Sequence, residues 1–277
     1  MRKSIYKKIE EKYNLSLLGK SFKDKYFLLK YSLDFHAQKI GMKSLWSNNY
    51  IEVNIKSNGN YYRVNTIDSI EYSSVFKEIF SDKQYEPIEN IQNVKVVVDL
   101  GANIGLFAIY NNSYHKNAKL ICIEPEAQNY KLLKKNIKMN NIKAITLQKA
   151  ITDKQSNKLI KIYKSKSSTG YSINSNYSDE EEFFEAIGIT LEKVCVENNI
   201  RSIDILKCDI EGAEKNIFIN ILGEFKNKIK YIILEYHSEE IRKIVIRSLK
   251  SDFNLTSHRK FGLNDIGLLT FRNKTKA

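Results

Sequence analysis

The sequence predicts an α/β fold: a doubly wound, mostly parallel sheet of seven strands, preceded by an extension of helices and a β-hairpin. The first supporting observation is the run V-K-V-V-V at residues 94–98. β-Branched residues at nearly every position are typical of a strand that is buried on both faces. The second is that short apolar segments recur after it at spacings that leave room for helices between strands. The third is the turn D-L-G-A-N-I-G at residues 99–105, which leads from that strand into an apolar helix.

The expected elements follow the chain in order. Apolar residues at helical spacing predict helices within residues 1–46, and alternation over residues 51–64 around the turn S-N-G-N predicts a β-hairpin. A helix is expected over residues 68–80. After the strand at 94–98 and a helix at 106–110, we expect strands at 120–123, 144–147, 203–206, 231–234, 253–257 and 267–271, with helices at 126–140 and 241–249.

The domain boundary is expected in the polar segment 82–93, which contains Pro87. This divides the chain into an N-terminal extension over residues 1–90 and a ligand-binding domain over residues 91–277. The extension is interpreted as a small helical cap or as a lysine-rich surface that meets a negatively charged partner.

The chain has 277 residues and a net charge of +13 at pH 7. Such a charge is typical of proteins that bind nucleic acid, an anionic membrane surface or phosphorylated molecules. Lysine and asparagine are spread along the whole chain, however, which favours a compositional bias. No apolar run reaches the roughly eighteen residues of a membrane span, and the N-terminus lacks the apolar core of a secretory signal. The three cysteines form no C-x-x-C pair, so we expect reduced thiols in a cytoplasmic protein.

The turn after the strand at 94–98 is the first candidate binding element. In an open α/β sheet, ligands lie outside the carboxyl ends of the strands, and glycine lets the backbone approach a ligand closely. Gly101 and Gly105 are spaced G-x-x-x-G, which is not the G-x-G-x-x-G of a dinucleotide site. Asp99 ahead of the glycines suits a ligand with a cationic amino group. The alternative is a turn that binds nothing.

Two further strand ends extend this candidate site. Glu124, followed by Pro125, ends the second strand, where a carboxylate can accept both hydroxyls of a ribose. The alternative is an acid that favours the start of the next helix. Ala150 and Ile151 follow the third strand, where Ile151 can pack on an adenine ring. A turn before a β-excursion over residues 158–163 explains them nearly as well.

The ends of the fourth and fifth strands carry acids and a histidine. Asp209 follows the fourth strand, and Glu235 and His237 follow the fifth. His237 can act as a general base, because imidazole titrates near neutrality. Asp209, Glu211, Glu235 and His237 can alternatively bind Mg²⁺ or Mn²⁺. A third interpretation treats His237 as an ordinary residue at a helix start. Asp209 is the stronger catalytic candidate, because it emerges directly from an apolar strand.

The chain resembles the FkbM family of S-adenosylmethionine (SAM) methyltransferases. The similar motifs are V-V-D-L-G-A-N-I-G at 97–105, I-E-P at 123–125 and, most specifically, I-D-I-L-K-C-D-I-E-G-A-E at 203–214. The resemblance implies a class I methyltransferase fold and methyl transfer from SAM to oxygen, commonly a hydroxyl of a sugar or a polyketide. It places the cofactor-binding residues at the motifs and at an aromatic residue ahead of them: Tyr85, Asp99, Gly101, Ala102, Asn103, Gly105, Glu124, Pro125, Ala150, Ile151 and Asp209.

The preferred function is O-methylation of a small-molecule or glycan acceptor, and residues 1–60 are expected to set acceptor specificity. The positive charge adds the expectation of a phosphorylated or lipid-linked acceptor. One alternative is an RNA methyltransferase, but the chain lacks the [D/N]-P-P-[F/Y] and Pro-Cys motifs of two nucleic-acid methylase classes. The other is a SAM-fold scaffold protein without activity. The sequence predicts neither the identity of the acceptor nor the oligomeric state.

Overall fold

The computed structural model describes residues 13–39, 46–153, 157–165, 171–172, 178–210, 218, 225–261 and 265–276. The chain divides into two compact units. The first boundary lies between Glu89 and Asn90, and two later segments also belong to the first unit. The first unit comprises Met1–Glu89, Ile104–Lys116 and Leu132–Ile142, and the second comprises Asn90–Asn103, Asn117–Lys131 and Lys143–Ala277.

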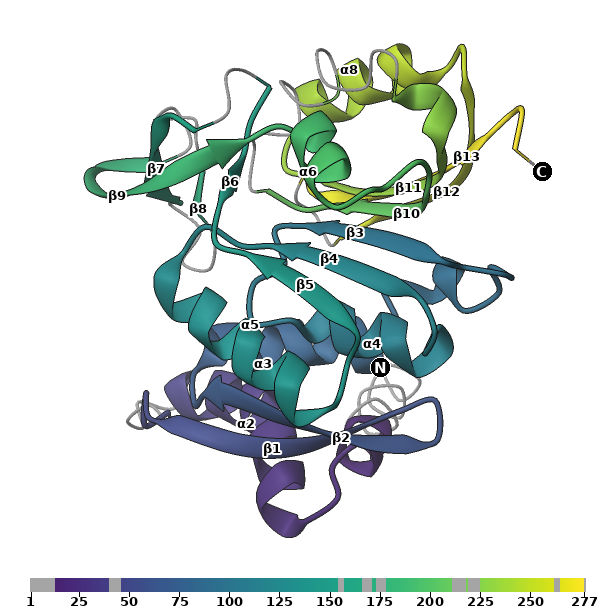
Figure 1. Ribbon diagram of the computed structural model, residues 1–277. Coiled ribbons are helices and arrows are strands. Elements are labelled where there is room, and N and C mark those ends of the chain that lie inside the picture. Colours follow the sequence, from purple (N-terminus) through teal and green to yellow (C-terminus); the bar gives the residue numbers. More distant parts are fainter. Residues whose placement is uncertain are drawn as a thin grey trace. The chain divides into compact units, whose positions relative to one another are not determined.

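The second unit contains the predicted sheet (Figure 1), whose seven described strands lie in the order β12-β13-β11-β10-β3-β4-β5. All neighbouring pairs are parallel except those of β13, which runs antiparallel to β11 and β12. The predicted mostly parallel sheet is thus confirmed. The bounds are β3 Val96–Leu100, β4 Lys119–Ile123, β5 Ala144–Leu147, β10 Ile203–Cys208, β11 Ile229–Tyr236, β12 Phe253–Lys260 and β13 Gly267–Asn273.

The strand order creates a switch point between β3 and β10. The chain runs outward from β3 to β4 and β5, and then returns to the other side of β3 to form β10 and β11. Connections therefore leave β3 and β10 in opposite directions. In open α/β sheets, the carboxyl ends of the strands at such a point border the ligand-binding crevice. The residues that follow Leu100 and Cys208 are therefore the candidates for ligand binding.

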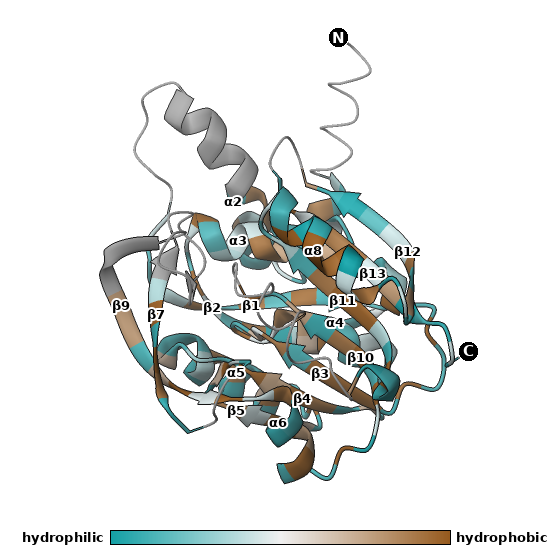
Figure 2. Ribbon diagram, turned by 90° about the horizontal axis from the view of Figure 1, so that it is seen from above, coloured by the Kyte–Doolittle hydropathy of each residue, from teal (hydrophilic) through white to brown (hydrophobic). Residues whose placement is uncertain are grey.

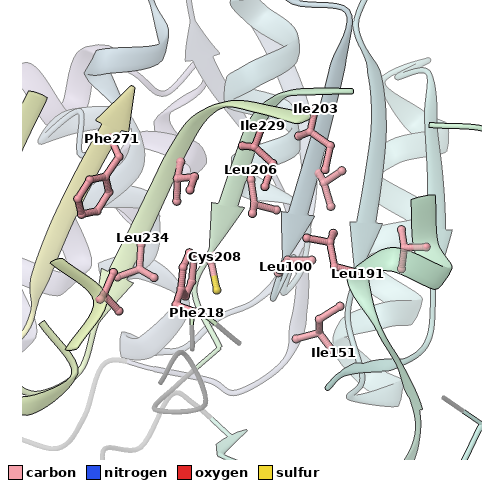
Figure 3. Close-up of a cluster of buried hydrophobic side chains, with 14 of the residues drawn as sticks. Leu100, Ile151, Leu191, Ile203, Leu206, Cys208, Phe218, Ile229, Leu234 and Phe271 are labelled. Carbon is pink, nitrogen blue, oxygen red and sulfur yellow. The ribbon is translucent and has the colours of Figure 1, made fainter. Parts of the chain in front are cut away.

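One face of the sheet packs in a large hydrophobic core (Figure 3). Leu100, Cys208 and Leu234 contribute to it from three neighbouring strands. Because side chains alternate along a strand, Asp99, Lys207 and other neighbours of these residues belong to the opposite face. The core also includes residues of two helices, α6 Leu191–Glu197 and α8 Glu239–Leu249.

The amphipathic pattern of α8 explains its place in this core. Ile241, Val245 and Leu249 are buried and recur at every fourth position, so they form one apolar stripe. Figure 2 shows hydrophobic and hydrophilic residues side by side on α8. The short helical turn η4, Lys226–Lys228, precedes β11.

A second, four-stranded sheet follows β5 in the chain, in the order β6-β9-β7-β8. It contains the predicted β-excursion, because β7 overlaps residues 158–163. The acidic run at 179–182 lies within β9. The bounds are β6 Ala150–Ile151, β7 Leu159–Ser165, β8 Tyr171–Ser172 and β9 Ser178–Ile189.

The first unit is built on the hairpin of β1, Tyr50–Ser57, and β2, Asn60–Ile67. Its turn is formed by Asn58 and Gly59, both with positive φ, as the predicted Asn-Gly turn requires. Asn136 fixes β2 by accepting a hydrogen bond from the Asn65 backbone N–H at 2.7 Å and donating one to the Asn65 carbonyl at 3.0 Å. The helical elements are α2 Phe22–Lys39, α3 Ile70–Phe76, the π-helical turn η1 Lys77–Ser81, the 3₁₀ turn η2 Glu86–Ile88, α4 Leu106–Tyr114 and α5 Ala127–Met139. The first part of α5, up to Lys131, belongs to the second unit.

Across the described part of the chain, no helix is both long enough and apolar enough to span a membrane.

Candidate active site

The turn after β3 contacts the end of β10 closely. Gly101 has a φ of +78°, and a Cβ atom there would lie 1.8 Å from the carbonyl oxygen of Asp209. The Asp209 backbone N–H donates to the Leu100 carbonyl at 3.1 Å, which continues the pairing of the two strands. Only glycine fits this position, because any side chain would both strain the backbone and collide with β10. The two strand ends at the switch point therefore form one packed unit.

A buried ion pair lies beneath this turn. Asp99 and Lys207 are register partners on β3 and β10, and Asp99 Oδ1 lies 3.1 Å from Lys207 Nζ. Burial raises the pKa of the Asp99 carboxyl, and the Lys207 ammonium opposes the rise. Asp99 Oδ2 is buried and accepts no hydrogen bond from the described residues. A buried acceptor without a partner is costly, so we expect a donor for this oxygen.

Lys207 makes further contacts at the same point, and the sequence analysis assigned it no role. Its ammonium donates to the Gly101 carbonyl at 2.7 Å and lies 3.7 Å from Asp209 Oδ2. The sequence signal was a lysine that directly follows the apolar pair Ile205–Leu206 within a strand. A charge in such a strand has to be paired, because fully buried lysines are rare without partners.

Glu124 organises the turn from the end of β4. Its carboxylate accepts hydrogen bonds from the backbone N–H groups of Asn103 at 2.8 Å and Glu126 at 3.0 Å. The N–H groups of Gly101 and Ala102 both donate to the Ile123 carbonyl, at 3.0 and 2.9 Å. Burial raises the pKa of Glu124 to about 7. Each carboxylate oxygen accepts more than one hydrogen bond, so Glu124 retains capacity for ribose hydroxyls.

The remaining predicted cofactor residues occupy several positions. Gly105, with a φ of +89°, begins α4. Ala150 and Ile151 form β6 and are buried, and Pro125 is partly exposed after β4. Tyr85 belongs to the first unit, where its buried ring packs edge-on against Phe107 at a centroid distance of 4.8 Å. Their roles in cofactor binding remain predictions.

The expected convergence of acids and histidine involves three residues. His237 Nε2 lies 3.8 Å from Asp209 Oδ1 and 3.9 Å from Glu235 Oε1. One possible ligand atom from each residue lies within 4.8 Å of the others. β11 extends two residues beyond its predicted end, so Glu235 lies inside the strand and His237 directly follows it. Glu211 lies outside the described residues.

The charges at these strand ends favour a cationic ligand. Asp99, Asp209 and Glu235 are acids, whereas Lys207 is the one permanent cation that contacts this group among the described residues. A sulfonium compound with an amino group matches this balance, because opposite charges are attracted strongly where water is excluded. His237, held between two carboxylates, can accept a proton from a neighbouring hydroxyl.

Two relatives of this chain carry methyltransferase names. The methyltransferase sdnD of Sordaria araneosa is 25% identical over 247 residues, which cover 75% of this chain and 92% of the relative. The 31-O-demethyl-FK506 methyltransferase FkbM of Streptomyces tacrolimicus is 22% identical over 200 residues, covering 62% and 76%. Among solved structures, M. capricolum TrmK in complex with S-adenosyl-homocysteine aligns with a TM-score of 0.43 and 12% identity, covering 71% of this chain and 70% of that chain.

The family assignment depends on a match over the central part of the chain. A family model described as the methyltransferase FkbM domain matches residues 99–254, from the acid that ends β3 into β12. This match covers more than half of the chain and includes Asp209 and His237. The protein therefore belongs to the FkbM family of SAM-dependent methyltransferases.

Proposed function

We propose that the protein transfers the methyl group of SAM to a hydroxyl of a small-molecule acceptor, a sugar, glycan or related compound. The observation that carries this proposal is the position of His237 Nε2 within 4 Å of two carboxylates, at strand ends next to the β3–β10 switch point. Oxygen as the acceptor atom is also supported by the relative named 31-O-demethyl-FK506 methyltransferase.

Donor binding is assigned to the first three strand ends. Asp99 Oδ2, buried and without a hydrogen-bond donor among the described residues, accepts from the donor's amino group. Glu124 accepts from the ribose hydroxyls with the acceptor capacity that its two backbone hydrogen bonds leave. Ala150 and Ile151 pack against the adenine ring. SAM supplies an electrophilic methyl group on a sulfonium.

The chain's own residues handle the proton. When the acceptor oxygen bonds to the methyl carbon, the carbon–sulfur bond breaks and its electron pair stays on sulfur, giving neutral S-adenosylhomocysteine (SAH). The acceptor's hydroxyl proton passes to His237 Nε2. Asp209 and Glu235 stabilise the resulting imidazolium, because both carboxylates lie within 4 Å of that nitrogen. Asp209 also orients the acceptor hydroxyl.

A divalent cation is a second candidate for the same three side chains. Two carboxylates and one imidazole form a donor set that suits Mg²⁺ or Mn²⁺, and their ligand atoms lie within 4.8 Å of one another. Such an ion, when bound, lowers the pKa of the acceptor hydroxyl. In that case Asp209, Glu235 and His237 hold the ion, and His237 is not the base.

Calorimetric titration with SAH, with Mg²⁺ or with EDTA, tests the donor site. We expect micromolar binding, and Asp99→Ala and Glu124→Ala are each expected to weaken it. Metal-independent binding supports the His237 base, and binding that strengthens with Mg²⁺ supports the cation site. Folded wild-type protein that binds no SAH in either condition would overturn the proposed function.

A transfer assay with isotopically labelled SAM and a panel of monosaccharides, nucleotide sugars and polyketide alcohols tests the acceptor. Asp209→Asn and His237→Gln are expected to lose about 100-fold or more of the transfer rate while still binding SAH. His258→Gln, which changes an exposed histidine outside this cluster, is the matched control and should retain activity. Methylation of nitrogen in RNA, with no O-methyl product, would contradict the proposal.

A further inference from the structure

Lys207 is the one lysine or arginine side chain within β10, and it is almost completely buried. Its side chain is 4% exposed, and the neighbouring Leu206 and Cys208 are fully buried. Moving an ammonium group out of water costs several kcal/mol unless partners replace the lost hydration. The position of this lysine is therefore explained by the groups that it contacts.

Those groups come from both sides of the switch point. On the β3 side, the ammonium donates to the Gly101 carbonyl at 2.7 Å and lies 3.1 Å from Asp99 Oδ1. It also lies 3.7 Å from Oδ2 of Asp209, just past the end of its own strand. The first two groups belong to the turn assigned to the methyl donor, and the third belongs to the acid–histidine cluster.

We propose that Lys207 is a positioning residue that holds the donor-binding turn and the Asp209 carboxylate in fixed relation to each other. This inference rests on the proposed function. Lys207 contributes beyond neutralising Asp99, because its shortest contact is to a neutral carbonyl of the glycine turn. Fixing the donor and the group that orients the acceptor relative to each other matters, because transfer rates fall steeply with small misplacements.

The chemistry of lysine fits this role better than that of its nearest substitutes. An ammonium has three N–H donors on one small centre, and three acceptor groups surround this one. Arginine carries a planar fork of donors and is larger, so it cannot keep one compact cation at the same distances from these three groups. Methionine fills a similar volume but donates no hydrogen bond.

The test compares SAH affinity by calorimetry, together with thermal unfolding, in Lys207→Met, Lys207→Arg, Asp99→Asn and the double variant Asp99→Asn/Lys207→Met. Lys119→Met is the matched control, because it removes a 2.8 Å lysine-to-carbonyl hydrogen bond at the opposite, amino-terminal end of β4, which pairs with β3 on the side away from β10. We expect Lys207→Met to weaken SAH binding about tenfold or more, whereas Lys119→Met changes it less than about twofold. Lys207→Arg is expected to recover thermal stability better than SAH affinity.

The double variant separates positioning from simple charge compensation. It leaves no unpaired charge at Asp99, so it also remains informative if Lys207→Met alone fails to fold. If Lys207 only neutralises Asp99, the double variant binds SAH as well as Asp99→Asn does, and the inference is overturned. Positioning predicts binding at least about fivefold weaker than that of Asp99→Asn.

The SAH affinities of the wild-type protein and Lys207→Met also show whether a failure concerns the positioning role of Lys207 or the proposed function. Wild-type affinity in Lys207→Met, with normal SAH binding by the wild-type protein, would reject the positioning role and leave the function standing. In the transfer assay, Lys207→Met is expected to raise the KM for SAM and to lower kcat, whereas Asp99→Asn chiefly raises KM. A purely structural lysine would lower the unfolding temperature without this combined change.

Discussion

The two units each bury a lysine–aspartate pair, and the two pairs differ in how many of the aspartate oxygens have a donor. In the first unit, Lys30 Nζ contacts both oxygens of Asp68, at 2.7 and 2.6 Å, and the Ser47 hydroxyl donates to Oδ2 at 2.7 Å. In the second unit, Lys207 lies near one oxygen of Asp99, and the other accepts no hydrogen bond from the described residues. The aspartate of the first pair is therefore fully paired, whereas that of the second keeps an oxygen without a donor at a strand end, where we propose that the methyl donor's amino group binds.

The glycine turns of the two units show the same contrast. Gly59 in the hairpin and Gly101 after β3 have nearly equal φ values, +79° and +78°. A Cβ atom at Gly59 would meet nothing within 4 Å, whereas one at Gly101 would lie 1.8 Å from the Asp209 carbonyl. The first glycine serves only the backbone turn. The second also lets two strand ends approach each other.

Alanine substitutions at these two glycines should give the largest difference. We expect Gly101→Ala to lose more than about 3 kcal/mol of unfolding free energy and to abolish SAH binding, because strain and collision add. Gly59→Ala, with strain alone, should lose about 1–2 kcal/mol and keep its SAH affinity. Chemical denaturation and calorimetry measure both. Equal losses at the two positions would mean that the contact with β10 adds no constraint.

The closed ion pair gives the next largest effect. Lys30→Met leaves the Asp68 carboxylate buried without its ammonium partner, and we expect a loss of about 3–5 kcal/mol of unfolding free energy. SAH affinity of the folded fraction should stay unchanged. The double variant Lys30→Met/Asp68→Asn should recover part of the stability. Weaker SAH binding by folded Lys30→Met would show that this pair also supports the site.

The raised pKa of Glu124 leads us to expect that SAH affinity depends on pH. Burial raises its pKa to about 7 from 4.5, and ribose hydroxyls favour the ionised carboxylate. SAH affinity should therefore rise with pH, by up to about tenfold between pH 6 and 8, with proton release on binding. The effect on folding is opposite, because the folded protein binds this proton more tightly than the unfolded chain. The contribution of this carboxyl group to folding stability is fully present below about pH 4.5 and is lost as the pH rises through about 7.

Glu124→Gln is the control for that dependence. It should bind SAH more weakly, with an affinity that hardly changes over the same pH range. A wild-type affinity that does not change from pH 6 to 8 would contradict the assigned contact with the ribose.

Two helix caps give the smallest effects. Ser238 Oγ accepts from the Ile241 N–H at 3.1 Å, and Thr190 Oγ1 accepts from the Lys193 N–H at 3.2 Å. Replacement of either by alanine should cost about 1 kcal/mol of unfolding free energy. Only Ser238 adjoins His237, so Ser238→Ala should also lower the transfer rate, by about twofold to threefold. Equal transfer rates in the two variants would show that the Ser238 cap does not help to position His237.

Much of the second unit could be predicted from the sequence, because its signals are local. The β-branched run of β3, the glycine turn and the acids after apolar strands each follow from neighbouring residues. The range predicted for β5 is the observed Ala144–Leu147. The hairpin could be predicted for the same reason, since Asn58 and Gly59 form its turn.

The rest depends on contacts between distant residues. Lys207 is one charged residue in a strand, and its role appears only when register places it opposite Asp99. Glu124 was predicted to bind a ligand, but its hydrogen bond to the Asn103 N–H depends on how β4 ends beside the turn. β9 includes an acidic run, residues 179–182, that is atypical of strands and lies between its register pairs with β7 at Ser178 and Phe183.

The two ends of the four-stranded sheet's segment are paired with each other, through β6 and the end of β9. This pairing affects which insertions and deletions the protein can tolerate. Ala150 pairs with Gly188 and Ile151 with Ile189, and the Thr152 N–H donates to the Ile189 carbonyl at 2.9 Å. These pairs hold the two ends of the insertion side by side, whatever lies between them. Lengthening a loop beyond such a closure costs little free energy. We therefore expect the segment between these pairs to tolerate changes in length, which makes the two pairs suitable junctions for chimeras between relatives.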